Sequence, residues 1–135
     1  MHQADLIQLV ILIVLIVLSG YFSSSETALS SVNRITLKSM ADSGDRRAAL
    51  TLKILDDYSK MLSAILIGNN VVNLSASALA TSLIIRIFGE SMVSAGTAAL
   101  TILIILFGEI TPKNSAKTNA LQISMRNAPV IQLLM

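Results

Sequence analysis

Three apolar runs, each long enough to cross a lipid bilayer, constrain the fold of this chain more than any other feature. They cover residues 4–24, 61–85 and 92–110. A membrane-spanning helix needs about 17–25 mostly apolar residues. The composition agrees with this interpretation, because only 13% of the residues are charged, whereas soluble domains have about 25%. We therefore expect one all-α membrane domain with three transmembrane helices.

The first run has about the length of a signal peptide, but no basic segment precedes it and no small-residue cleavage pattern follows. We expect it to be a retained span. It continues into a polar but nearly uncharged stretch, in which Ser19, Ser23, Glu26 and Ser30 fall along one helical stripe. The serines could line a polar path, or they could form ordinary hydrogen bonds between helices. The pattern alone favours neither alternative.

Two segments between and after the runs, residues 33–58 and 114–128, are amphipathic and carry most of the charge. Gly44 divides the first of them into two short helices, and Asp45 is placed to cap the second one. Since spans flank these segments, we expect helices that lie on the membrane surface rather than soluble connectors.

The basic residues predict the orientation of the spans. Six of them lie in the connection after the first run, one in the short turn after the second, and three after the third. Cytoplasmic loops are enriched in Lys and Arg. We therefore expect a multi-pass protein of the plasma membrane with its N-terminus outside and its C-terminus in the cytoplasm.

The second run contains the densest group of polar residues found in any apolar run here. Ser63, Asn70 and Asn73 can share one helical face, with Asn69 at its edge. Such amides could simply hydrogen-bond between helices, but those bonds average below about 1 kcal/mol and seldom require three asparagines within five residues. We therefore favour ion ligands or pathway residues.

The third run ends in a carboxylate followed by a proline. An acidic residue such as Glu109 costs about 2.5–3.5 kcal/mol at mid-span, so it usually faces a bundle interior and has a function. Pro112 has no N–H, and in an α-helix the carbonyl of Gly108 would lose its partner. This stretch therefore offers two oxygen ligands side by side.

Together these side chains predict a site for a hard cation. The chain has no cysteine and one histidine, His2, so a metal must be held by oxygen, as Mg2+, Ca2+ and Na+ prefer. A storage site would add carboxylates, whereas one carboxylate suits a transport site that must also release its ion. A monovalent ion would be balanced by the same single charge.

Three stretches resemble the transmembrane domain of the cyclin M/CorC family of magnesium transporters: residues 19–28, 68–73 and 108–113. The resemblance covers essentially the whole chain. It implies a homodimer of three-span bundles with juxtamembrane belt helices, and export of Mg2+ or its exchange for Na+. It also implies that the ligands are Ser19, Ser23, Asn70 and Glu109, with Ser63, Asn69, Asn73 and the Gly108 carbonyl as further candidates.

Members of that family normally continue into cytosolic CBS modules that bind nucleotide, and these 135 residues contain no counterpart. We therefore interpret the sequence as an isolated membrane domain and predict nothing about its regulation by nucleotide. The alternative to a transporter is a scaffold or ion-sensing module that moves no ion. We expect neither enzymatic activity, because no intramembrane His, Cys or paired Asp could act as nucleophile or base, nor a nucleic-acid partner.

Overall fold

A computed structural model describes residues 3–135, except for the surroundings of Gly108. The expected fold class is confirmed, because the described residues form helices and turns with no strand, and three helical stretches are long and apolar enough to span a membrane. In chain order the helical segments are α1 (Gln3–Ser31), α2 (Arg34–Asp42), α3 (Arg46–Asp56), α4 (Tyr58–Phe88), η1 (Glu90–Met92), α5 (Val93–Ile104), η2 (Ile105–Ile110), α6 (Thr111–Thr118) and α7 (Ala120–Leu134).

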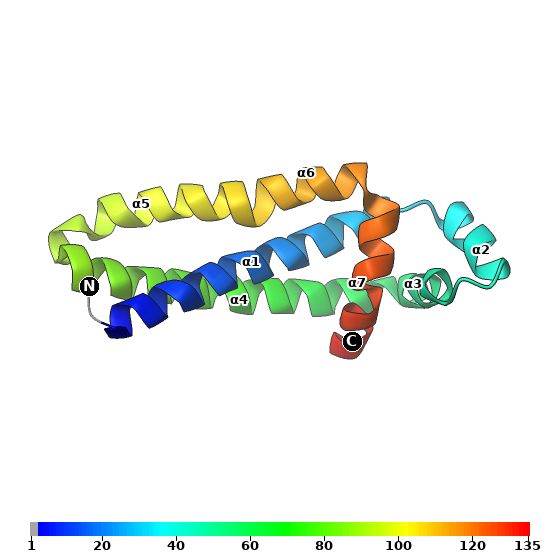
Figure 1. Cartoon of the computed structure of the whole chain (residues 1–135), viewed down its shortest axis with the longest axis horizontal. Coiled ribbons are helices and arrows are strands. Elements are labelled where there is room, and N and C mark those ends of the chain that lie inside the picture. The colour runs from blue at the N-terminus through cyan, green and yellow to red at the C-terminus, as the bar shows by residue number, and fades with distance from the viewer. Residues whose placement is uncertain (1–2) are drawn as a thin grey trace.

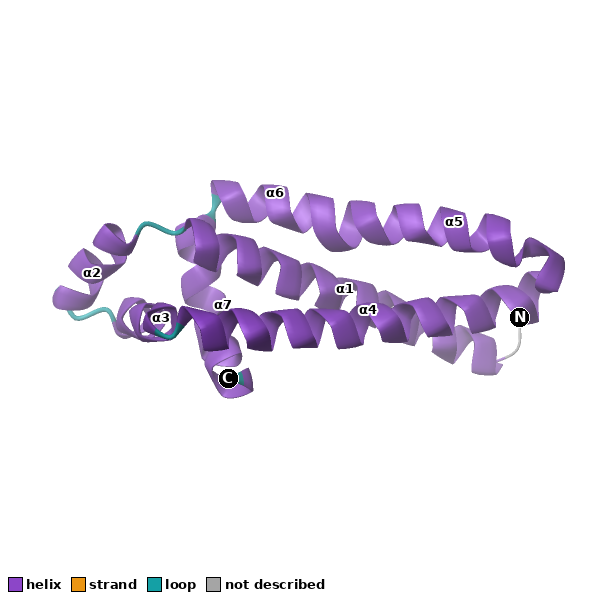
Figure 2. Ribbon diagram, turned by 180° about the vertical axis from the view of Figure 1, so that it is seen from behind, coloured by secondary structure: helices purple, strands orange, loops and turns teal. Residues whose placement is uncertain are grey.

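The long helices form an elongated bundle (Figure 1). Helix α1 packs against α4 on one side and against η2 and α6 on the other, while α5 returns along α4 from the turn at η1. Helix α7 crosses the opposite end of the bundle, and the short helices α2 and α3 extend beyond it, as the view from behind also shows (Figure 2). We refer to these two ends as the η1 end and the α7 end.

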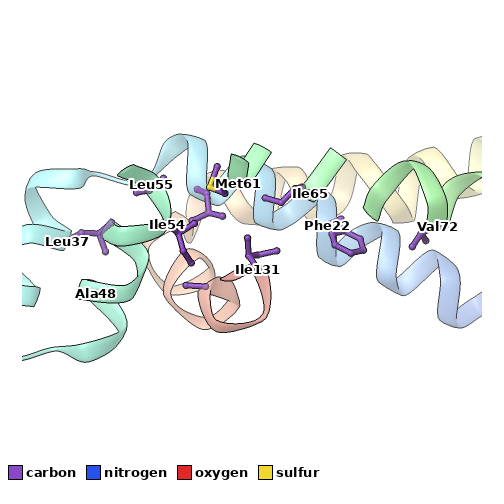
Figure 3. Packing of buried hydrophobic residues seen from close by; sticks show 11 residues of the cluster. Phe22, Leu37, Ala48, Ile54, Leu55, Met61, Ile65, Val72 and Ile131 are labelled. Carbon is purple, nitrogen blue, oxygen red and sulfur yellow. The ribbon is translucent and has the colours of Figure 1, made fainter. Parts of the chain in front are cut away.

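The main hydrophobic core lies at the α7 end (Figure 3). There Phe22 of α1, Met61 and Ile65 of α4, Ile54 of α3 and Ile131 of α7 pack together, so the surface helices are anchored to the spans. A second cluster toward the η1 end joins α1 to α4 through small residues on α4 and leucines, namely Leu12, Ala76, Ala80 and Leu83.

Many large apolar side chains stay exposed along the spans. Val17 on α1, Leu74 on α4 and Phe107 on η2 are each more than half exposed, and α5 has no buried residue. Lipid tails are as apolar as these side chains, so such a surface is expected of helices surrounded by a bilayer.

Side-chain caps start both short helices, and the cap of α3 is the one that the sequence predicts. Asp45 Oδ1 accepts hydrogen bonds from the N–H groups of Arg47 at 3.0 Å and Ala48 at 3.1 Å, which confirms it as the N-cap of α3. Asn33 caps α2 in the same way. These caps satisfy N–H groups that have no partner within their own helix.

The third span differs from a simple α-helix ending near residue 110. Its helical path continues to Thr118, and the change in geometry is the π-helical turn η2 directly before Pro112. Pro112 lies in the first turn of α6, where a missing N–H is tolerated. A π-turn inserted into an α-helix is uncommon and is frequently found at functional sites.

Candidate ion-binding site

A cluster of hydroxyl and amide groups joins α1 to α4 in the middle of the bundle. The Ser19 hydroxyl donates to Asn73 Oδ1 at 2.7 Å and lies 3.4 Å from Asn69 Oδ1. Asn73 Nδ2 in turn donates to Asn69 Oδ1 at 3.5 Å. The structure thus brings together three of the predicted ligands, because residues four apart on α4 present their side chains to the same side of α1.

Close packing next to this cluster depends on Gly68. A Cβ placed there would lie 2.7 Å from Cζ and 2.8 Å from Cε1 of the Phe22 ring. Contacts that short are not tolerated, so the absence of a side chain lets the ring sit directly against the α4 backbone. This contact sets the spacing and rotation of α4 relative to α1 at the Ser19 level.

The other side of α1 contacts the π-turn through Gly20. A Cβ on Gly20 would lie 3.1 Å from Cγ of Pro112 and 3.6 Å from the carbonyl oxygen of Phe107. The Thr111 N–H donates to the Leu106 carbonyl, five residues earlier, as expected in a π-turn. In that register the residue paired with the Phe107 carbonyl is Pro112, which has no N–H. The freed carbonyl next to α1 is therefore that of Phe107.

Ser23 carries a buried hydroxyl without a hydrogen-bond partner in the part of the chain that the structure describes. Its side chain is 1% exposed, and its Oγ has no hydrogen-bond partner among the described residues. It lies four residues after Ser19 and three after Gly20, so around α1 it falls between the side that faces α4 and the side that faces the π-turn. A buried hydroxyl without a partner costs about 1–3 kcal/mol. An oxygen in that condition is available to a ligand.

Glu109 lies in η2 and is partly buried. The structure forms one ion pair among the residues it describes, between Arg86 and Asp5 at the η1 end, so no basic side chain of the described part neutralises Glu109. The carboxylate belongs to the turn that contacts α1 at Gly20, which puts it on the third helix of the same region.

Two other predicted ligands are not brought to this cluster. The side chains of Ser63 and Asn70 are exposed on the surface of the single chain. The backbone of Gly108 is part of η2, but its surroundings lie outside the described residues, so the prediction for its carbonyl stays open.

Sequence reasoning missed the Phe107 carbonyl and the link from α1 to α7. At that link, Asn127 Nδ2 donates to Ser25 Oγ at 2.8 Å in a buried hydrogen bond. Pro112 could have indicated the free Phe107 carbonyl only if the π-helical register of the turn were known. Nothing in the sequence pairs residues 102 positions apart.

The chemistry of the region is that of neutral oxygens around one carboxylate. Within the described part of the chain, no group of three His, Cys, Asp or Glu side chains could hold a metal. An apolar cavity of about 460 Å³ lies toward the η1 end, lined by Leu12, Ile84, Met92 and other apolar residues, and offers no ligand to a cation. The polar region between α1, α4 and η2 is therefore the candidate site.

Comparison with known proteins identifies the family. Residues 10–135 match the description of the cyclin M transmembrane N-terminal domain. The chain is 40% identical over 126 residues to a UPF0053 protein of Haemophilus influenzae, which covers 93% of this chain and 30% of that protein. It is 41% identical over 99 residues to the UPF0053 inner membrane protein YfjD of Escherichia coli, covering 73% of this chain and 23% of that protein.

A chloroplastic DUF21 domain-containing protein of Arabidopsis thaliana is 38% identical over 114 residues, which covers 84% of this chain and 17% of that protein. The chain thus spans less than a third of the length of these relatives. The match over residues 10–135 and the 40% identity across 93% of the chain place this protein in the cyclin M transmembrane domain family.

Proposed function

We propose that this domain transports Mg2+ across the membrane through the polar region between α1, α4 and η2. The observation that carries the proposal is the buried, unpartnered hydroxyl of Ser23, which falls around α1 between the Ser19–Asn73 contact and the contact of Gly20 with the π-turn. Membrane helices bury such groups at a cost, and polar residues inside a bundle frequently mark the path of an ion.

The ligand chemistry favours a hard cation. Mg2+ binds oxygen at near-octahedral geometry and often retains waters, so it needs few protein ligands. Ser19, Ser23, Asn69, Asn73 and Glu109 supply hydroxyl, amide and carboxylate oxygens from three helices. One carboxylate leaves a divalent ion incompletely neutralised, which favours release as well as loading.

Two further predicted ligands require a change in helix position. Asn70 follows Asn69 and is therefore about 100° around α4 from it, and Ser63 is exposed as well. Both would approach the ion only if α4 turned during transport or a second subunit completed the site. A homodimer, as the resemblance implies, is part of the proposal.

The proposal also covers the membrane that holds the domain and its orientation there. The Lys and Arg distribution favours an orientation with the C-terminus and the α7 end on the cytoplasmic side, and the similarity to an inner membrane protein of Escherichia coli supports the plasma membrane. As the resemblance implies, the proposed activity is export of Mg2+ or its exchange for Na+.

Calorimetric titration of the purified protein with Mg2+ tests the site. Glu109→Gln keeps the shape of the side chain and removes its charge, so we expect Mg2+ binding to weaken at least tenfold. Glu90→Gln, in η1 at the far end of the bundle, makes the same change and is the matched control, with binding expected to stay as in the wild type. Unchanged binding in Glu109→Gln would mean that the ion is held elsewhere.

Flux into vesicles that contain a Mg2+-sensitive dye separates transport from the second candidate, an ion sensor that moves no ion. One observation favours that candidate: the buried Asn127–Ser25 hydrogen bond ties α7 to α1 two residues from Ser23. An ion at Ser23 could therefore shift α7. Mg2+ binding without flux in reconstituted protein would select the sensor over the transporter.

A further inference from the structure

A basic groove lies between the surface helices at the α7 end, away from the candidate ion site. Its volume is about 510 Å³. Helix α2 contributes one lining residue, α3 one, and α7 four: Met40, Arg47, Leu121, Gln122, Met125 and Arg126. We call it the Arg47–Arg126 groove.

The charge of the groove is uncompensated. Its lining contains two arginines and no acidic residue. The one ion pair among the described residues is far away at the η1 end, so neither guanidinium is paired within that part of the chain. Two like charges on one small concave surface repel each other, and an anion placed between them would relieve that repulsion.

The rest of the lining is apolar and adaptable. Met40, Leu121 and Met125 form most of the remaining surface. Methionine side chains are unbranched and flexible, so they fit ligands of irregular shape. The groove therefore combines an anion-binding part with a surface that suits hydrocarbon.

The position of the groove matches the headgroup region of a bilayer. Helix α7 buries Ala128 and Ile131 against the spans, while Val130 and Leu133 are exposed, 86% in the case of Leu133. Such a helix, crossing the ends of the spans (Figure 1), is typical of one that lies in the membrane interface. Helix α7 also packs against α1 and α3, which holds the groove at the ends of the spans.

We infer that the Arg47–Arg126 groove binds an anionic phospholipid. Its phosphodiester group would lie between the two guanidinium groups, and an acyl chain would lie along Met40, Leu121 and Met125. The planar guanidinium presents paired N–H donors that match phosphate oxygens. Basic pockets at the membrane interface are known to bind anionic headgroups. The lining offers no carboxylate to pair with the ammonium of a zwitterionic lipid, so an anionic lipid is favoured.

Such a lipid would connect α3 to α7, the two surface helices that carry the arginines. The inference concerns a surface outside the candidate ion site and does not depend on Mg2+ transport. The two proposals can therefore fail separately.

Lipid binding can be measured on the purified chain with a dye attached through Ser91→Cys, since the chain has no native cysteine and Ser91 is exposed in η1 at the far end. The probes are phosphatidylglycerol and phosphatidylcholine with the same acyl chains. We expect preference for phosphatidylglycerol, and a loss of about fivefold in its affinity for each of Arg47→Gln and Arg126→Gln. The double variant should lose about twenty-fivefold, with phosphatidylcholine binding unchanged.

Arg46→Gln is the matched control, because Arg46 is the exposed neighbour on α3 and does not line the groove. Affinity for phosphatidylglycerol should stay at the wild-type level in this variant. Equal losses in Arg46→Gln and Arg47→Gln would show a diffuse charge effect and overturn the inference. Helix content by circular dichroism, together with partial recovery of binding in Arg47→Lys and Arg126→Lys, which keep the charge but not the paired N–H donors, separates a lost site from a misfolded protein.

Two further outcomes would assign the groove to another occupant. Inorganic phosphate that displaces phosphatidylglycerol at millimolar concentration, with no contribution from the acyl chains, would make it a site for free phosphate. A change in oligomeric size in the double variant, with the lipid preference intact, would make it a contact between two copies of this chain. Either result overturns the lipid assignment.

Discussion

Gly68→Ala is the sharpest test of how α1 and α4 are held at the candidate site. The added Cβ would lie 2.7 and 2.8 Å from two atoms of the Phe22 ring. Ordinary contacts of this kind are about 3.5–4.0 Å, so the ring or the helix must move by roughly 1 Å. Phe22 is 9% exposed and is packed in the main core, so the ring has little room to move away.

The expected loss of stability is the cost of overpacking the core minus the gain in helix propensity. Overpacking a filled core costs about 1–3 kcal/mol, while replacing Gly by Ala inside a helix gains about 0.5–1 kcal/mol. Gly68→Ala should therefore lower the free energy of unfolding by about 0–2.5 kcal/mol. Mg2+ affinity should fall as well, because moving α1 from α4 lengthens the 2.7 Å contact between Ser19 and Asn73.

The assay is unfolding by SDS titration in detergent, followed by helix content and combined with a double-mutant cycle. Phe22→Leu shortens the side chain that meets the new Cβ, so the double variant should be more stable than the sum of the single effects by about 1 kcal/mol. A Gly68→Ala protein that is more stable than the wild type, by the full helix-propensity gain, would refute the close contact. Additive effects in the cycle would refute the assignment of the strain to Phe22.

Three further changes test the contacts that hold the helices together. Arg86 and Asp5 form an ion pair at 3.1 Å, and Asp5 is buried. Arg86→Gln should destabilise the protein more than Asp5→Asn, because it leaves a buried charge unpaired. SDS titration of both variants measures the order, and the reverse order would show that the pair is not the source of stability. Ser25→Ala should lower the free energy of unfolding by about 1–3 kcal/mol, because it leaves Asn127 Nδ2 buried without its acceptor. Proteolysis should then cut α7 faster, and an unchanged cleavage rate would count against the Asn127–Ser25 hydrogen bond as the anchor of α7. Asp45→Ala should cost about 1 kcal/mol through loss of the α3 cap, measured by the same titration, whereas a loss near zero would mean that α3 is held by packing alone.

Much of the fold follows from local sequence. Apolar runs of sufficient length specify spanning helices because backbone groups in lipid must be paired within the segment itself. Asp45 specifies the start of α3 because a side-chain oxygen satisfies N–H groups only two and three residues away. Such features act within one helical turn, so the sequence is enough to predict them.

The composition of the candidate site was also predictable, but its geometry was not. The period of the helix fixes the angle between Asn69, Asn70 and Asn73, yet it does not say which of them faces α1. That choice depends on the rotation of α4, which the contact between Gly68 and Phe22 and the packing of Ala76 and Ala80 determine. The face of Ser63 and Asn70, favoured from spacing alone, is exposed in the single chain.

By itself, the sequence determines that this is a three-span, all-α membrane domain whose polar residues can bind a cation only through oxygen. The tertiary structure alone decides which oxygens meet, because their positions depend on contacts between residues far apart in the chain. The π-turn makes the Phe107 carbonyl the one that Pro112 leaves free, and Gly20 allows that turn to approach α1. The Asn127–Ser25 hydrogen bond likewise exists only because packing places α7 across the end of the bundle.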